Sequence, residues 1–278
     1  MNPISKNRID QKFRDLKARG QKAFIAYITA GDPSPERTPE LVWALERAGA
    51  DVVELGVPFS DPLADGVVNQ LSAQRALEAG TTTAKVFEIL RAVRKQSQVP
   101  LVLYTYLNLL CAYGIDRFCQ DAHQAGADGL LVLDLPPEES QGANGIGARL
   151  GDGRLCRISL VAPTSPAERI ATIVQKATGF VYYVSREGVT GMQEHVATSI
   201  GSRIDLLRKH TTLPICVGFG ISTPDQARAV AQQADGAVVG SVLVNRIAEW
   251  ARDKDLPQKL EAFARPLAQA IHEGKSGN

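Results

Sequence analysis

Residues 48–56, AGADVVELG, contain the turn and the strand on which the fold assignment depends. A helical pattern over 39–48 ends here in Ala-Gly-Ala, and an apolar run follows at once. The same Ala-Gly-Ala-Asp turn returns at 125–128, and a related Gln-Ala-Asp-Gly turn stands at 233–236. A helix-to-strand turn that recurs in this way predicts one β/α unit repeated along the chain.

Strand-like runs recur along the whole chain, and most are apolar throughout rather than alternating between apolar and polar residues. Such runs are typical of parallel strands that are buried on both faces. Helical patterns separate them at 39–48, 83–95, 115–125, 138–150, 166–177, 196–209 and 224–232. The eight predicted strands are AFIAYIT (23–29), DVVEL (51–55), PLVLYTY (100–106), GLLVL (129–133), LCRISLV (155–161), FVYYV (180–184), PICVGF (214–219) and GAVVG (236–240).

Eight parallel β/α units close most simply into a TIM (β/α)8 barrel of the α/β class. The alternative is a doubly wound open sheet, which would carry a GxGxxG loop after its first strand, and AFIAYITAGDP contains none. We therefore expect a single barrel domain over residues 1–278. An extra N-terminal helix is predicted at 5–19 with Ser5 as its cap, and an extra helix at the C-terminus.

The composition excludes several classes of protein. The chain has 278 residues, 44% of them hydrophobic and 22% charged, which is typical of a globular protein with a large core. A net charge of +1 predicts no nucleic-acid partner. The polar N-terminus and the short apolar runs predict neither a signal peptide nor a membrane span. Cys156 and Cys216 lie in strand-like runs and are predicted to be reduced core thiols of a cytoplasmic protein.

The ends of the last two predicted strands indicate a phosphate site. Active sites of such barrels lie at the C-terminal ends of the strands. GFGIS (218–222) and VGSV (239–242) each lead into a helix, so backbone N–H groups and the Ser241 hydroxyl gather where this fold often holds phosphate. The GVTG loop at 188–191 is a third contributor. The alternative is a pair of ordinary glycine turns.

Glu54 ends the second predicted strand. Alternation places it with Val52 and Gly56 on one face of the strand. A glutamate at the inner mouth of a barrel is partly desolvated, which raises its pKa and favours a general acid or a proton shuttle. The alternative is a glutamate at the rim, paired with Arg or Lys.

Two aspartates follow Glu54 on a loop that Pro58 and Pro62 stiffen. Asp65 is placed to face Glu54 across a pocket, which gives two carboxylates in different environments. Asp61 competes for this role, but Asp-Pro commonly begins a turn, so we expect Asp61 to cap the loop.

The sequence lacks the residues that two other types of catalysis require. Schiff-base aldolases need a lysine at the end of a strand, and none of the lysines is there. The four histidines are scattered, so no metal site is predicted. Carboxylate acid–base chemistry on a small phosphorylated molecule remains.

The stretch ELGVPFSDPLADG (54–66) resembles the signature of the tryptophan synthase alpha subunit family. ITAGDP (28–33), DLPPEE (134–139), SREGVTG (185–191), GFGIS and VGSV follow in the order of that family. The resemblance implies a carbon–carbon lyase that splits indole-3-glycerol phosphate into indole and glyceraldehyde 3-phosphate by a retro-aldol reaction. It also implies a heterotetramer with a beta subunit, which receives the indole and uses pyridoxal phosphate, whereas the alpha chain needs no cofactor.

The same resemblance assigns roles to individual residues. Glu54 corresponds to a proton-shuttling glutamate, and Asp65 to an aspartate that contacts the indole nitrogen. Thr190 helps to position Asp65, and Gly191 closes the loop over the site. The walls around the substrate are formed by Tyr27, Tyr106, Tyr182 and Val238, and the phosphate is held by Phe219, Gly220, Gly240 and Ser241.

The chain departs from the family pattern at a few positions. Val67 and Asn69 stand where the family usually has Pro and an aliphatic residue, and Leu133 replaces a frequent Pro. Because this region tends to face the beta subunit, the departures bear on the Asp65 loop and on coupling to the partner. Alternatives are a stand-alone lyase that releases indole, an inactive barrel that activates a partner, and a phosphate-binding barrel isomerase. The presence of Glu54 and Asp65 argues against the inactive barrel, and an isomerase would not require ELGVPFSDPLADG.

Overall fold

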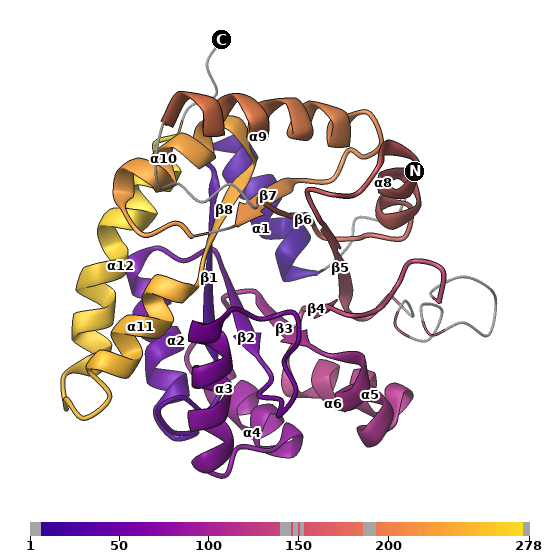
Figure 1. Ribbon diagram of the computed structural model, residues 1–278. Coiled ribbons are helices and arrows are strands. Elements are labelled where there is room, and N and C mark those ends of the chain that lie inside the picture. Colours follow the sequence, from indigo (N-terminus) through magenta and orange to yellow (C-terminus); the bar gives the residue numbers. More distant parts are fainter. Residues whose placement is uncertain are drawn as a thin grey trace.

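Eight parallel strands form a closed barrel, surrounded by helices, in the computed structural model (Figure 1), which describes residues 7–139, 146, 150, 153–185, 193–218 and 220–274. Strand β1 closes the barrel because it pairs with β2 on one side and β8 on the other. The strands are β1 Ala23–Thr29, β2 Val52–Gly56, β3 Leu101–Thr105, β4 Gly129–Val132, β5 Cys156–Val161, β6 Val181–Val184, β7 Ile215–Gly218 and β8 Gly236–Val239. The predicted barrel is confirmed, and the open sheet is excluded.

The helices agree with the sequence less completely than the strands do. The described helices are α1 Arg8–Ala18, α2 Thr38–Ala48, α3 Val67–Glu78, α4 Thr83–Arg94, α5 Leu107–Tyr113, α6 Ile115–Ala125, α8 Ala167–Val174, α9 Gln193–Arg208, α10 Pro224–Gln233, α11 Ser241–Glu249 and α12 Leu256–His272. The predicted Ser5 cap is wrong, because the Asn7 side chain accepts the Ile9 N–H and caps α1. Helices α3 and α5 were not predicted, and most of the segment 138–150 lies outside the described residues.

The extra N-terminal helix closes one end of the barrel. Ile9, Phe13 and Leu16 of α1 belong to the same apolar cluster as the inward-facing side chains of the strands. The Phe13 ring lies 5.6 Å from the Phe180 ring, centroid to centroid. A second apolar cluster fills the space between the outer faces of the strands and the helices, including α12. Helix α1 therefore takes the N-terminal end of the barrel out of contact with water. The opposite end, where the strands run into the β/α loops, is called the mouth below.

The repeated turn has a structural purpose at that N-terminal end. Its aspartate accepts the N–H of the first or second residue of the preceding strand and returns its own N–H to the carbonyl of the same residue. The pairs are Asp51 with Phe24, Asp128 with Leu101 and Asp235 with Ile215. Each aspartate thus fastens two neighbouring strands together where they begin.

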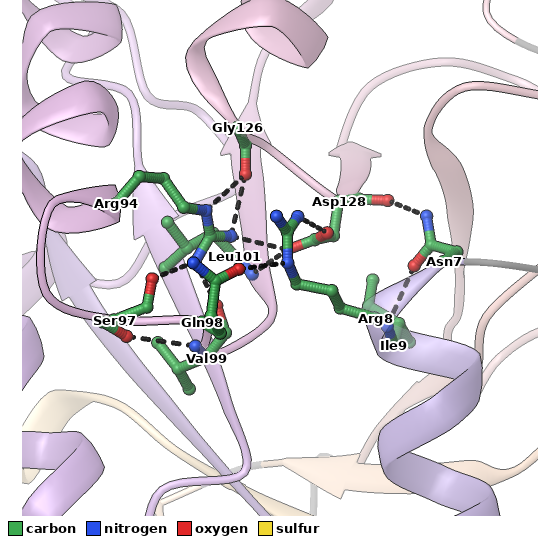
Figure 2. A network of polar contacts seen from close by, with 10 residues as sticks. All are labelled: Asn7, Arg8, Ile9, Arg94, Ser97, Gln98, Val99, Leu101, Gly126 and Asp128. Atoms are coloured by element: carbon green, nitrogen blue, oxygen red, sulfur yellow. Dashed lines mark hydrogen bonds and ion pairs between the residues drawn. The ribbon is translucent and has the colours of Figure 1, made fainter.

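Asp128 is the most completely paired of the three aspartates (Figure 2). Its carboxylate lies 2.8 Å from the Arg8 guanidinium and 2.7 Å from that of Arg94. Arg94 also donates to the Gly126 carbonyl within the same turn. The charge of this buried carboxylate is therefore fully compensated.

The cysteines and the helices also bear on two predictions made from the sequence. Cys156 and Cys216 are free thiols and are buried, as predicted. Within the ranges given above, none of the helices has both the length and the apolar character that crossing a membrane requires.

Candidate active site

The mouth of the barrel is lined by side chains that continue the inward-facing rows of the strands. Glycines on neighbouring strands make room for the larger ones. A Cβ atom on Gly56 would lie 2.3 Å from the Tyr27 hydroxyl, and one on Gly218 would lie 2.5 Å from that of Tyr182. Toward this end, the inward-facing rows include Tyr27, Glu54, Tyr104, Tyr182 and Val238.

Glu54 is enclosed and has no polar partner. It is 1% exposed, and neither of its carboxylate oxygens forms a hydrogen bond within the described part of the chain. Its inward position follows from the strand alternation, because Val53 and Leu55 pack on the outer side of β2. Burial raises the pKa of Glu54 to about 8, so the carboxyl group is mostly protonated at neutral pH. The alternative of a rim glutamate paired with Arg or Lys is wrong.

Asp65, in contrast, stands in a polar environment. The Tyr104 hydroxyl donates to Oδ1 at 3.0 Å, and the Tyr106 hydroxyl donates to Oδ2 at 2.7 Å. Burial raises the pKa of Asp65, whereas the hydrogen bonds from Tyr106, Tyr104 and Asn69 lower it. The two carboxyl groups therefore have different environments, as the sequence predicted: Glu54 has no hydrogen-bond donor within the described chain, whereas Asp65 accepts hydrogen bonds from two tyrosines.

The loop that carries Asp65 is fastened near that residue. The Ala64 N–H donates to the Tyr106 hydroxyl at 3.1 Å, and Gln70 donates to the Asp65 carbonyl at 2.8 Å. Val67 is the first residue of α3, with Gly66 as the N-cap, so the unusual VVNQ stretch forms the first turn of a helix.

The expected capping role of Asp61 is wrong. Its side chain is exposed and has no hydrogen-bond partner within the described ranges. Only its carbonyl contributes to the loop, by accepting the Leu63 N–H at 2.9 Å.

The predicted phosphate residues lie partly within the described chain. Gly220, with φ of +60°, follows β7, and Gly240 caps α11, whose first residue is the exposed Ser241. Strands β7 and β8 are hydrogen-bonded neighbours, so these turns leave adjacent positions in the barrel. The predicted residues Thr190, Gly191 and Phe219 lie outside the described residues.

Two features of the mouth were missed by sequence reasoning. Tyr104 supports Asp65 directly, and its only signal was its place two residues before Tyr106 on the same face of a strand. Asp32, in the loop after β1, accepts two hydrogen bonds from Arg75 and one from Ser72, which ties this loop to α3. Among the residues that the structure describes, no three His, Cys, Asp or Glu side chains form a group that could hold a metal ion.

A family model described as tryptophan synthase alpha chain matches residues 13–272. The chain belongs to this family. It is therefore a lyase of tryptophan biosynthesis and has the role of the alpha subunit, as the resemblance implied. The alternative of a phosphate-binding isomerase is excluded.

Individual relatives agree over nearly the whole length. The chain is 55% identical to the tryptophan synthase alpha chain of Opitutus terrae over 262 residues, which cover 94% of this chain and 97% of the relative. Among solved structures, the alpha subunit of Legionella pneumophila is 42% identical with a TM-score of 0.86, covering 95% of this chain and 98% of that one. A Mycobacterium tuberculosis tryptophan synthase in its aminoacrylate-bound form is 32% identical with a TM-score of 0.83, covering 96% and 100%.

Proposed function

We propose that this chain cleaves indole-3-glycerol phosphate at the mouth of the barrel, with Glu54 moving the proton and Asp65 balancing the charge on the indole ring. The observation that carries the proposal is the contrast between the two carboxyl groups. Glu54 has no hydrogen-bond partner within the described chain and is mostly protonated at neutral pH, whereas Asp65 accepts hydrogen bonds on both oxygens. Two carboxyl groups in such different environments divide the acid and the charge-stabilising roles between them.

The proton balance of the reaction closes on Glu54. The protonated carboxyl group donates to C3 of the indole, which turns the ring into an electron sink. The carboxylate that remains takes the proton of the glycerol hydroxyl, so that a carbonyl forms, the C–C bond breaks and its electrons return to the ring. Glu54 is then protonated again, and indole and glyceraldehyde 3-phosphate leave.

Asp65 acts at the other side of the indole. Positive charge develops on the ring nitrogen once C3 is protonated, and a fixed carboxylate stabilises this charge in a site shielded from water. Each carboxylate oxygen can accept more than one hydrogen bond. Asp65 is therefore able to accept the indole N–H while it stays bonded to Tyr104 and Tyr106.

The remaining predicted residues bind the substrate. Tyr27, Tyr106, Tyr182 and Val238 offer the apolar and aromatic walls that a flat indole requires. Gly220, Gly240 and Ser241, at two turns that each lead into a helix, are proposed to hold the phosphate with backbone N–H groups, with the Ser241 hydroxyl and with the favourable dipole of α11. Thr190, Gly191 and Phe219 are proposed to complete this cradle and the loop over it.

A beta subunit is the proposed partner, and it supplies the pyridoxal phosphate that this chain does not need. Leu63 is 90% exposed and Val67 is 69% exposed, and Leu71 lies one turn further along α3. Exposed apolar side chains that gather in one region mark a surface for another protein. Because they adjoin the Asp65 loop, docking there would couple the partner to the site. The complex is proposed to act in the cytoplasm.

One assay tests the reaction and the coupling separately. Pure chain is mixed with indole-3-glycerol phosphate, and indole release is followed with and without a beta subunit. We expect slow release by the chain alone and faster release in the complex. No release in either case would refute the lyase mechanism, whereas equal rates would favour a stand-alone lyase. Leu63→Ser should weaken the stimulation by the partner, and an unchanged stimulation would remove Leu63 from the docking surface.

A further inference from the structure

The loop that carries Asp65 runs from residue 57 to residue 66 and contains no strand or helix. Its side chains include several that face solvent, so packing alone does not hold the carboxylate in place. A displacement of about 1 Å in a catalytic group can cost a hundredfold in rate. The contacts that fix this loop are therefore part of the catalytic machinery.

Tyr104 contacts this loop at both of its ends. Its carbonyl accepts the N–H of Val57, the first residue after β2, at 2.9 Å. Its hydroxyl donates to Oδ1 of Asp65, the residue before the N-cap of α3, at 3.0 Å. Tyr104 of β3 thus bonds to both ends of the loop and fixes the Asp65 carboxylate relative to the barrel.

The Tyr104 ring is itself held firmly. It packs edge-on against the Tyr27 ring, with 4.9 Å between the centroids. Burial raises the pKa of the Tyr104 hydroxyl well above its usual range, so this group stays protonated and remains a donor throughout the working pH range. The ring contact survives the loss of the hydroxyl, which allows the hydrogen bond to be tested without removing the packing.

Tyr104 and Tyr106 differ in what their hydroxyl groups do. The Tyr106 hydroxyl donates to Asp65 and also accepts the Ala64 N–H, so it supports the loop backbone as well as the carboxylate. The Tyr104 hydroxyl, within the described residues, has the Asp65 carboxylate as its only hydrogen-bond partner. Removing it therefore takes one hydrogen bond from the carboxylate and leaves the backbone hydrogen bonds of the loop in place.

We propose that Tyr104 is a positioning residue for the lyase reaction: its hydroxyl holds the Asp65 carboxylate ionised and aimed at the indole nitrogen. This inference rests on the role proposed above for Asp65. Because the Tyr104 hydrogen bond lowers the pKa of Asp65 against the effect of burial, its loss moves that pKa upward. The ionised fraction of Asp65 then falls at the acid side of the pH range.

The test is Tyr104→Phe in the full chain. We expect kcat to fall roughly tenfold to a hundredfold with a smaller change in KM, because the bond serves a charge that develops in the transition state. The acid limb of the kcat/KM profile should move to higher pH. The matched control is Tyr113→Phe, which removes a 2.7 Å hydrogen bond from a tyrosine to Asp121, outside the mouth of the barrel, and should leave kcat and the profile unchanged.

A double-mutant cycle separates positioning from general damage. Tyr104→Phe should cost kcat/KM much less in an Asp65→Asn background than in the native chain, and an equal cost in both overturns the inference. If Asp65→Asn is too slow to assay at steady state, single-turnover rates measured with the enzyme in excess over the substrate complete the same cycle. An active native chain with an unmoved Tyr104→Phe profile also overturns the inference but leaves the proposed function intact. An inactive native chain overturns both.

Discussion

The two ends of the barrel treat a buried carboxyl group in opposite ways. At the N-terminal end, Asp128 meets two arginines and a backbone N–H (Figure 2), and its side chain is 4% exposed. At the C-terminal end, Glu54 is equally enclosed but has no partner within the described chain. The two side chains are similarly buried, but Asp128 is paired with cations, whereas Glu54 has a raised pKa and keeps its proton near neutral pH.

The difference shows where the chain uses carboxylates for stability and where it uses them for chemistry. A buried carboxylate with cations and N–H donors joins elements together, and removal of one member leaves the others uncompensated. A buried carboxyl group without partners has a raised pKa and is ready to give up a proton near neutral pH. In barrels of this type, stability resides at the N-terminal face and catalysis at the C-terminal face.

The largest effect is expected at the C-terminal end. Glu54→Gln should lower kcat about a hundredfold to ten-thousandfold, because a general acid contributes that much and the amide cannot donate its proton to carbon. Substrate binding, measured by calorimetry, should persist because the shape of the side chain is kept. Glu40→Gln on the exposed side of α2 is the control and should behave as the native chain. Turnover by Glu54→Gln within a few-fold of the native rate would remove Glu54 from the central role.

The next effect is expected at the N-terminal end and concerns stability. Asp128→Ala should lower the free energy of unfolding by about 3–5 kcal/mol, because Arg94 stays buried without its counter-charge. The value of kcat per folded molecule should not change. Urea unfolding measures the first quantity, and an assay corrected for the folded fraction measures the second.

The control for Asp128→Ala is an exposed ion pair. Asp225 lies 3.4 Å from Arg228, and its side chain faces solvent. Asp225→Ala should therefore cost at most about 1 kcal/mol. Equal losses of unfolding free energy in the two variants would mean that burial does not make the Asp128 ion pairs more important for stability than an exposed pair.

The fold could be predicted largely because local signals agreed with it. The Ala-Gly-Ala-Asp turns and the apolar runs located every strand to within one residue at either end. Helix α3 was missed because the residues it buries, Ser72, Ala73 and Ala76, are small and give no apolar period. Helix α5 was missed because it is short and buries Leu110 alone.

The geometry of the site could be predicted only where the alternation of side chains along a strand determines which way a side chain points. The inward orientation of Glu54 follows from a period of two along a strand. The hydrogen bonds to Asp65 come from Tyr104 and Tyr106, which lie 39 and 41 positions further along the chain. No local sequence pattern encodes such a contact. Asp61 was expected to cap the loop for the local reason that Asp-Pro begins turns, yet its side chain has no partner within the described chain. The catalytic and binding roles of these residues remain predictions.

A third prediction uses the pH dependence of stability to test whether Glu54 at the C-terminal end is protonated. The pKa of Glu54 is about 8 in the folded chain and near 4.5 in the unfolded chain, so between these values the folded state binds one proton more. Stability from this group is present in full below about pH 4.5 and is lost as pH rises toward 8. From pH 6 to 7 the native chain should lose roughly 1.4 kcal/mol relative to Glu54→Gln. A difference between the two chains that does not vary with pH would contradict a protonated Glu54.

Among the three aspartates at the N-terminal end (Asp51, Asp128 and Asp235), the smallest loss of stability is expected for the least enclosed one. Asp235 forms the same backbone bond as Asp128, from Ile215 at 3.0 Å, but its side chain is 37% exposed and Arg208 lies 3.7 Å away. Solvent screens such a pair, so Asp235→Ala should cost only about 1–2 kcal/mol, mostly from the lost N–H bond. Asp51→Ala should fall between Asp235→Ala and Asp128→Ala, because Asp51 is nearly buried and pairs with His272 at 2.8 Å. Urea unfolding of the three variants under one condition tests this order. A cost for Asp235→Ala as large as that for Asp128→Ala would mean that the backbone bond, rather than the enclosed charge pairing, is what stabilises the N-terminal end.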